Sequence, residues 1–286
     1  MTFAWLLNLD AEEELESPAA HTPSSRVRDR IDALRVHLEP LLRGGVVLAE
    51  GVRADGLEGR AWCPTPSAQA RLARAGASLR RAPAIGVLRR VNHRRFSFEL
   101  GHNLPGARFV TTLADVLERD TSIAWLVKLP FGFAGRGRIP LPASVLTPEV
   151  EARVARALAG GEGAQLEPLV TRREDFAMHG FLDDEGRLTP GSLTRQRIDP
   201  RGAWQGTSLT TDAGVEARLR DELLRVSEAL GVAGYFGPFG IDAFTWEDPG
   251  GALHLHRRSE INARYSMGWA IGMGDARPDL RTAAPD

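Results

Sequence analysis

The sequence GYFGPFGIDAFTWEDPGGALHLHRRSEINARYSMG, residues 234–268, predicts two β-strands joined by a turn at Pro249-Gly250-Gly251. Asp242 lies near the middle of the first strand, and Glu260 and Asn262 lie near the end of the second. Side chains alternate between the two faces of a sheet. A turn centred on Gly251 therefore places all three on one face, with the two carboxylates about 5 Å apart. A turn centred on Pro249 would instead separate these carboxylates by roughly 13 Å.

Two carboxylates that converge beside a carboxamide repel each other and resist burial unless a cation lies between them. Mg²⁺ prefers hard oxygen ligands of this kind, and it usually keeps waters and substrate phosphates in its shell. A solvated strand face is the alternative interpretation. His254 and His256 form a His-x-His pair that could bind a transition metal, but no third ligand is evident, so an exposed strand face is the preferred interpretation there.

A second informative stretch is a glycine-rich turn between two strands, predicted over Ser122–Leu129 and Arg138–Leu141. Glycine lets backbone amides approach phosphate oxygens closely, and Lys128 just before the turn could add a cation. A plain hairpin is the alternative. The Walker motif is excluded because Arg138 follows Gly137 where Lys-Ser/Thr is required, and the dinucleotide fingerprint is excluded because prolines follow where a helix must begin.

The rest of the chain alternates strand and helix signals. The first part predicts a small parallel α/β lobe; its elements are a buried strand at Phe3–Leu9, a loop at Glu12–Ser25, a helix at Arg26–Leu42, a strand at Val46–Ala49, an apolar patch at Ala61–Cys63 and a helix at Ser67–Ala75. The remaining elements are a strand at Val87–Val91 leading to Phe96–Leu100, helices at Leu113–Leu117, Pro148–Leu158 and Val215–Leu230, and strands at Gln165–Val170, Asp175–Leu182 and Leu188–Ile198. The polar tail after Gly274 is predicted to fray.

Composition excludes several classes of protein. The 286 residues are 43% hydrophobic and carry a net charge of −1, which predicts a globular protein and gives no support for a nucleic-acid or anionic-membrane partner. Cys63 is the only cysteine, so neither an intrachain disulfide nor a cysteine-based metal site is expected. No secretory signal and no run of 18 apolar residues is evident, so a cytoplasmic protein is expected.

Taken together, the pieces WLVKLPFGFAGRG, QLEPLV, GIDAF and EINAR resemble, in order and spacing over residues 85–268, the ATP-grasp superfamily. The resemblance implies an α/β chain that becomes α+β toward its C-terminus, with a small parallel N-terminal lobe followed by two α+β lobes that clamp a nucleotide. The implied domains are 1–83, a pre-ATP-grasp lobe; 84–170, the central lobe with the glycine-rich turn; and 171–286, the lobe with the metal-binding strands.

The resemblance also implies roles for individual residues. Lys128 and Arg264 would be catalytic, the latter facing phosphate or a substrate carboxylate, and Asp242, Glu260 and Asn262 would bind Mg²⁺, or Mn²⁺ in its place. The residues implied in ATP binding are Lys128, Gly132, Gly135, Arg136, Gly137, Glu167, Leu169, Val170, Glu174 and Asp175.

The activity implied by the resemblance is ATP-dependent ligation of a small-molecule carboxylate to an amine through an acylphosphate. One departure concerns lysine: the family's second lysine is absent because Lys128 is the only one in the chain, and the arginines that could replace it are Arg89, Arg94, Arg195 and Arg197. This departure keeps one alternative open, a non-catalytic protein of the same fold that uses ATP as a structural or regulatory ligand. A kinase of small molecules is a further alternative.

Overall fold

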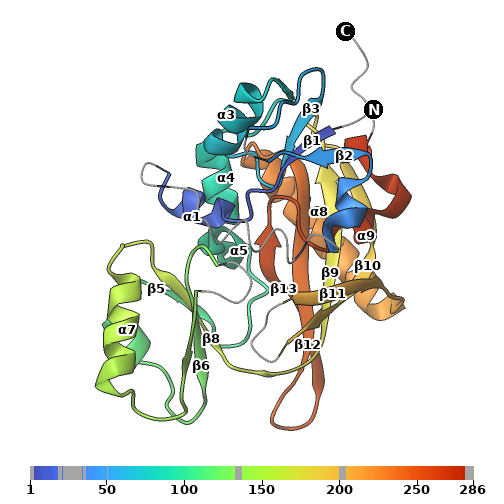
Figure 1. Cartoon of the computed structure of the whole chain (residues 1–286). Coiled ribbons are helices and arrows are strands. Elements are labelled where there is room, and N and C mark those ends of the chain that lie inside the picture. The colour runs from blue at the N-terminus through green and yellow to red at the C-terminus, as the bar shows by residue number, and fades with distance from the viewer. Residues whose placement is uncertain are drawn as a thin grey trace.

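The computed structural model describes residues 3–18, 21, 34, 37–49, 51–132, 137–199 and 204–280. These residues form three sheets that follow one another along the chain (Figure 1). The predicted combination of a parallel α/β part with antiparallel α+β parts is confirmed.

The first sheet is parallel, with strand order β2-β1-β3-β4. Its strands are β1 (Phe3–Leu6), β2 (Gly45–Val47), β3 (Glu58–Ala61) and β4 (Ser78–Leu79). All four residues of β1 are buried, as expected of a central strand in a parallel sheet covered on both faces. Helices α1 (Ala11–Glu16) and α3 (Pro66–Arg74) belong to this part, and residues 34 and 37–42 are helical, while the rest of the predicted helix Arg26–Leu42 lies outside the described residues.

The second sheet is antiparallel, with strand order β5-β8-β6-β7. Its strands are β5 (Arg108–Val110), β6 (Trp125–Lys128), β7 (Arg138–Leu141) and β8 (Ala164–Pro168). Helix α6 (Leu113–Leu117) begins with a capping box between Thr112 and Asp115, which satisfies backbone N–H groups at its start. Helix α7 (Pro148–Leu158) buries Val154 and Leu158 against this sheet in a hydrophobic cluster separate from the rest.

The third sheet is also antiparallel, with strand order β11-β10-β9-β12-β13. Its strands are β9 (Thr171–Leu182), β10 (Leu188–Ile198), β11 (Trp204–Leu209), β12 (Gly237–Glu247) and β13 (Leu253–Asn262). The long helix α8 (Ala213–Val232) lies against it through the predicted apolar stripe, of which Leu219, Leu223 and Leu230 are fully buried. The largest hydrophobic cluster runs from β1 to β12, so the first and third sheets share a core.

Two predicted segments differ in the structure. Val87–Val91 and the residues after it are helical, forming α4 (Ile85–Asn92) and α5 (Arg94–Glu99). Leu88 and Val91 are buried three residues apart while Arg89 and Arg90 are not, which is a helical and not an alternating pattern. The predicted loop at Glu12–Ser25 likewise begins as helix α1.

Strand β11 and helix α9 (Trp269–Met273) carry weak sequence signals and were not predicted. Within the described residues no helix is long and apolar enough to span a membrane.

The hairpin of β12 and β13 has the register on which the metal-site hypothesis depends, because Asp242 lies opposite Glu260 and Gly240 lies opposite Asn262. Its turn differs from the prediction. Phe244 pairs with His256 and Glu247 with Leu253, so the turn centres on Gly250 and not on Gly251. A β-bulge between the two halves of the hairpin supplies two extra residues on β13 and restores the acidic pair.

The predicted frayed tail is wrong for residues 275–280, which lie in or between the 3₁₀ turns η1 (Gly274–Ala276) and η2 (Pro278–Leu280), and residues 281–286 lie outside the described residues. The carboxylate of Asp279 is buried and accepts hydrogen bonds from Arg277, from Arg60 of β3 at 3.3 Å and from the Tyr265 hydroxyl at 3.1 Å. Arg277 also donates to the carbonyl oxygens of Pro40 and Leu41. This network ties the end of the described chain to the first sheet.

Asp279→Ala is therefore expected to lower the free energy of unfolding by about 3 kcal/mol, because it leaves the buried guanidinium group of Arg277 without its carboxylate, while Arg60 keeps Glu58 as a partner. Urea denaturation monitored by tryptophan fluorescence would measure the change. Asp275→Ala, at an exposed position of the same segment, serves as the control and should change the stability by less than about 0.5 kcal/mol. Equal stabilities of the two variants would contradict the structural role of this network.

Candidate functional site

The centre of the candidate site is formed by Asp242, Glu260 and Asn262 on one face of the third sheet. Asp242 accepts hydrogen bonds from Gln196 Nε2 at Oδ1 (2.7 Å) and from Asn262 Nδ2 at Oδ2 (3.1 Å). Burial, followed by repulsion from Glu260, raises the pKa of Asp242 to about 6. Both burial and a neighbouring carboxylate disfavour the charged form of an acid.

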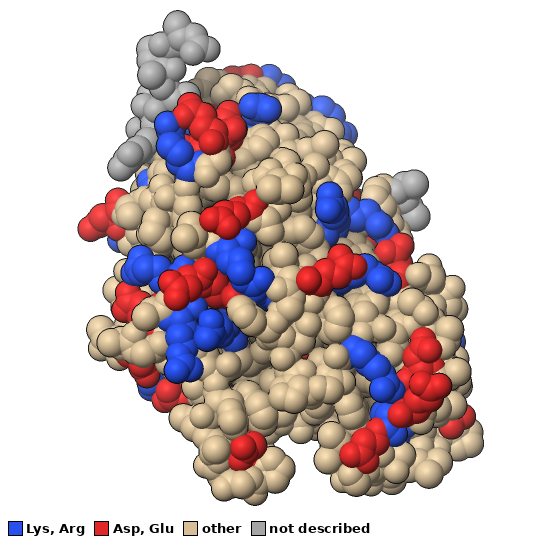
Figure 2. Space-filling view, turned by 180° about the vertical axis from the view of Figure 1, so that it is seen from behind, with Lys and Arg blue, Asp and Glu red and all other residues tan. Residues whose placement is uncertain are grey.

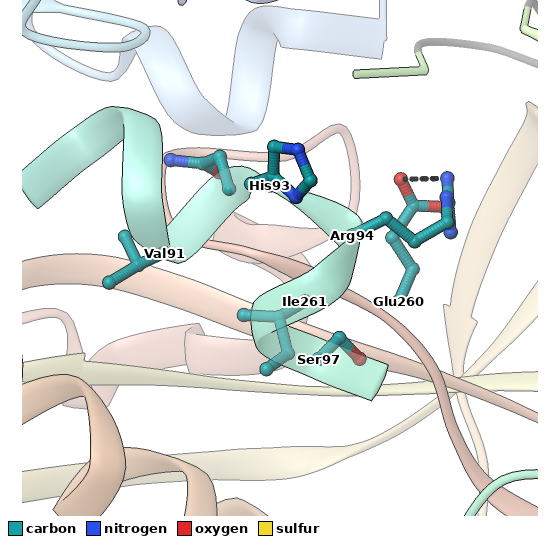
Figure 3. A pocket seen from close by; sticks show the side chains of 7 residues that line it. Val91, His93, Arg94, Ser97, Glu260 and Ile261 are labelled. Carbon is teal, nitrogen blue, oxygen red and sulfur yellow. Dashed lines mark hydrogen bonds and ion pairs between the residues drawn. The ribbon is translucent and has the colours of Figure 1, made fainter. Parts of the chain in front are cut away.

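Three basic side chains act on Glu260 of this acidic pair. Burial alone would raise the pKa of Glu260, but Arg94, Arg138 and Lys128 together lower it below its usual value. Arg94 makes the direct contact, with Nη2 donating to Glu260 Oε1 at 3.3 Å and Nε donating to the Leu129 carbonyl at 3.1 Å. Glu260 and Arg94 also line a pocket between β13 and the junction of α4 and α5 (Figure 3).

Arg94 is one of four arginines considered as replacements for the missing lysine, and the structure separates it from the others. Arg89 pairs with Glu162, Arg195 pairs with Glu174, and Arg197 donates to the carbonyl of Gln205. Only Arg94 of these four contacts the acidic pair. Arg138, at the start of β7, was not predicted as a site residue, because its charge reaches Glu260 only after the hairpin of β6 and β7 has formed.

Lys128 lies at the end of β6 and is 1% exposed. Its Nζ is 2.5 Å from Glu167 Oε1 on β8, and the other oxygen of Glu167 accepts a hydrogen bond from Gln165 at 2.8 Å. Burial lowers the pKa of Lys128 to about 8 although Glu167 opposes the shift, and Arg94 and Arg172 lower it further. The Glu167 carboxylate, predicted near the base or ribose, thus faces the lysine.

The predicted phosphate-binding turn is only partly described. Gly132 and Gly137 are placed, whereas Gly135 and Arg136 lie outside the described residues. Gly137 has a positive φ of 72°, which glycine adopts without strain, and its carbonyl accepts a hydrogen bond from the backbone N–H of Leu129. The two ends of the turn therefore meet next to Lys128 and Arg138, which lie opposite each other on the adjacent strands β6 and β7.

The other residues predicted for nucleotide binding lie where the second sheet passes into the third. Leu169 and Val170 join β8 to β9, and Leu169 is 52% exposed. Glu174 and Asp175 follow on β9 and pair with Arg195 and Arg172, respectively. Asp175 lies opposite Phe244 and therefore on the face that carries Asp242.

Arg264 is buried and forms an ion pair with Glu12 of α1. Arg264 was predicted to face a phosphate or a substrate carboxylate. The sequence does not predict its acidic partner, because Glu12 lies in a segment that is expected to be a loop.

The exposed-face interpretation of the two histidines is correct only for His254, which stacks on Trp246 and contacts Asp248. His256 is buried against Phe244, and burial lowers its pKa to about 4. Among the described residues no cluster of three histidine, cysteine or acidic side chains could hold a metal ion. A metal site at Asp242 and Glu260 therefore depends on Asn262 as its third ligand.

Charges on the surface opposite to the view of Figure 1 are mixed. Acidic and basic groups alternate over this face, and no large area of one sign stands out (Figure 2). The face therefore offers no continuous basic surface of the kind that nucleic acid requires.

Comparison with known proteins gives the following likenesses. No protein-family model matches the chain. Over 203 residues it is 28% identical to the butirosin acyl-carrier protein–L-glutamate ligase of Niallia circulans, and this match covers 65% of the chain but 46% of that protein. The chain thus spans less than half the length of this curated relative.

Solved structures cover nearly the whole chain at low sequence identity. A biotin carboxylase–β-γ-ATP complex from Campylobacter jejuni matches 94% of this chain and 67% of its own, with a TM-score of 0.57 and 12% identity. An N5-carboxyaminoimidazole synthetase from Staphylococcus aureus complexed with ADP matches 93% of this chain and 70% of its own, with a TM-score of 0.55 and 10% identity. The D-cycloserine synthetase DcsG matches 96% of this chain and 98% of its own, with a TM-score of 0.52 and 14% identity. The predicted fold is confirmed.

Proposed function

We propose that this chain, which has the ATP-grasp fold, is an ATP- and Mg²⁺-dependent ligase that joins a carboxylate to an amine. One observation carries the proposal: Asp242, Glu260 and Asn262 converge on one sheet face while Lys128, Arg94 and Arg138 approach from the facing elements. Anionic ligands for a metal beside cations for phosphates are what a metal–triphosphate complex requires.

The residues present fit a divalent cation. Asp242 and Glu260 lie opposite each other on adjacent strands, and Asn262 adds a neutral oxygen. Burial first, and then repulsion from Glu260, raises the pKa of Asp242, and a cation bound there would oppose both effects. Asp242, Glu260 and Asn262 would hold Mg²⁺, or Mn²⁺ in its place. When bound, the ion would offset the negative charge of the ATP phosphates.

The chain's own residues would bind and orient the nucleotide. Lys128 and the glycine-rich turn would contact its phosphates, and the turn would exclude water from the reacting groups. Leu169 and Val170, at the junction of the second and third sheets, would contact the base, and Glu174 and Asp175 the ribose. We also propose that the chain divides into domains at residues 83 and 170, close to where the first and second sheets end.

Arg94 and Arg138 would stabilise the charge that develops as the γ-phosphoryl group passes to a substrate carboxylate. The resulting acylphosphate would be attacked by an amine, which forms the amide and releases inorganic phosphate. The acid and the amine would be small molecules, or one of them would be held on a carrier protein, as the name of the Niallia relative states for its own substrate.

A screen for ADP release tests this proposal. Carboxylic acids, beginning with L-glutamate, would be paired with a panel of amino acids and with hydroxylamine, which traps acylphosphates as hydroxamates. We expect ADP and phosphate to form only when acid, ATP and Mg²⁺ are all present. Calorimetric ATP binding without release for any pair would favour a non-catalytic ATP-binding protein, and a stable phosphorylated product would favour a small-molecule kinase.

A further inference from the structure

Glu12 belongs to the N-terminal part of the chain and contacts Arg264, a residue predicted for the candidate site. It lies on α1, which begins a few residues after the carboxyl end of β1, a central strand of the first sheet. Its carboxylate meets Arg264, two residues beyond Asn262 on the chain. Arg264 therefore holds Glu12 next to the end of β13, the strand that carries Glu260 and Asn262, and the charge of Glu260 also acts on Glu12.

The two oxygens of Glu12 differ in their surroundings. Oε1 accepts hydrogen bonds from Arg264, whose third nitrogen donates to the Tyr265 carbonyl at 3.0 Å. Oε2 is buried and has no hydrogen-bond partner among the described residues, and Glu12 as a whole is only 7% exposed. A buried carboxylate oxygen left unpaired is costly, so a group that binds here and satisfies it gains affinity.

The chemistry of this atom specifies the ligand. A carboxylate oxygen accepts hydrogen bonds and attracts positive charge, so its partner must be a donor, and a charged N–H group binds it most strongly. Arg264 would be the natural partner of a substrate carboxylate, but its charge is already offset by Glu12. The pair as a whole thus keeps one unpaired acceptor, Glu12 Oε2.

We propose that Glu12 Oε2 binds the ammonium group of the amine substrate and accepts one of its protons, so that the neutral amine attacks the acylphosphate carbonyl and phosphate leaves, while Arg264 fixes the Glu12 carboxylate. The inference rests on the proposed ligase function and extends it, because it assigns the amine and not the acid to this part of the site. The amine is recognised in its protonated form, and a neutral amine gains much less from Glu12.

The test compares the unaltered chain with Glu12→Gln, which keeps the side-chain size and an oxygen for Arg264 but removes the charge. Steady-state ADP release would be measured with the best acid–amine pair from the screen. The KM for the amine is expected to rise about 10- to 100-fold, the effect of losing one charge-assisted hydrogen bond, and the KM for ATP to stay within about 2-fold. Hydroxylamine, uncharged near neutral pH, should trap the acylphosphate equally well in both proteins.

Two further variants complete the design. Glu12→Asp keeps the charge and should recover part of the affinity for the amine. Glu14→Gln alters the next buried acid of α1, whose carboxylate binds Thr65 and Ser67 at the start of α3, so it should lower stability but leave the KM for the amine unchanged.

An unchanged KM for the amine in Glu12→Gln, or an equal loss for ATP and amine, would overturn the inference while leaving the ligase proposal intact. If the unaltered chain releases no ADP with any pair, the ligase proposal fails and the inference fails with it.

Discussion

Glu260→Gln is expected to lower the rate of carboxylate-dependent ADP release by about 100- to 1,000-fold while leaving the fold intact. The substitution removes one of the two charged ligands proposed for the metal, and a neutral amide cannot offset the charge of a divalent cation in the same way. It also ends the repulsion that adds to burial in raising the pKa of Asp242, so that pKa should fall but stay above its usual value because Asp242 remains buried.

Stability should change little in this variant. Relief of the repulsion with Asp242 favours the folded state, whereas the contact between Arg94 and Glu260 weakens, and Arg94 keeps its bonds to the Leu129 and Ser259 carbonyls. The two effects oppose each other, so the free energy of unfolding should stay within about 1 kcal/mol. Urea denaturation, ADP release and calorimetric titration with Mg²⁺ in the presence of ATP would measure the three quantities.

Glu247→Gln is the matched control, because Glu247 lies on the same hairpin but pairs with Arg173 at the surface. It should retain full activity and Mg²⁺ dependence. A double variant, Asp242→Asn with Glu260→Gln, should abolish Mg²⁺-dependent release. Unchanged turnover in the double variant would eliminate the metal-site proposal and with it the ligase mechanism.

The sequence predicts the acidic pair through strand parity alone, but it does not predict how the pair is brought together. Parity depends only on the alternation of side chains, and an insertion of two residues preserves it. The bulge on β13 inserts two residues and moves the turn to Gly250 without changing which side chains share a face. The predicted face is therefore insensitive to the feature that the prediction missed.

The cations and the acid that come from other elements were harder to predict. Arg94 reaches Glu260 because α4 and α5 are helices that pack against β13, and the sequence had suggested a strand there. Glu12 reaches Arg264 because an acidic segment forms a buried helix. Charged residues normally favour solvent, so only the tertiary partner explains their burial.

Lys128→Met is expected to weaken ATP binding about 10- to 100-fold, because the variant lacks the cation proposed to contact the nucleotide phosphates. The same change leaves Glu167 buried without its partner, which should lower the free energy of unfolding by about 3–5 kcal/mol. Loss of ATP affinity could then be mistaken for loss of folded protein, so a second substitution is needed to separate the two effects.

The double variant Lys128→Met with Glu167→Gln provides this separation. Removing both charges should restore most of the stability, because neither buried group is then left unpaired, while ATP affinity should remain low. Calorimetry with ATP and urea denaturation of the same samples would measure both. If the stable double variant bound ATP as tightly as the unaltered chain, Lys128 would be only a structural partner of Glu167, and the phosphates would have to be bound by the arginines that surround Glu260.

The charge of Lys128 in the unaltered chain also depends on pH. Because its pKa is about 8, Lys128 loses its charge as the pH rises through 8, so the affinity for ATP measured by calorimetry should fall over that range.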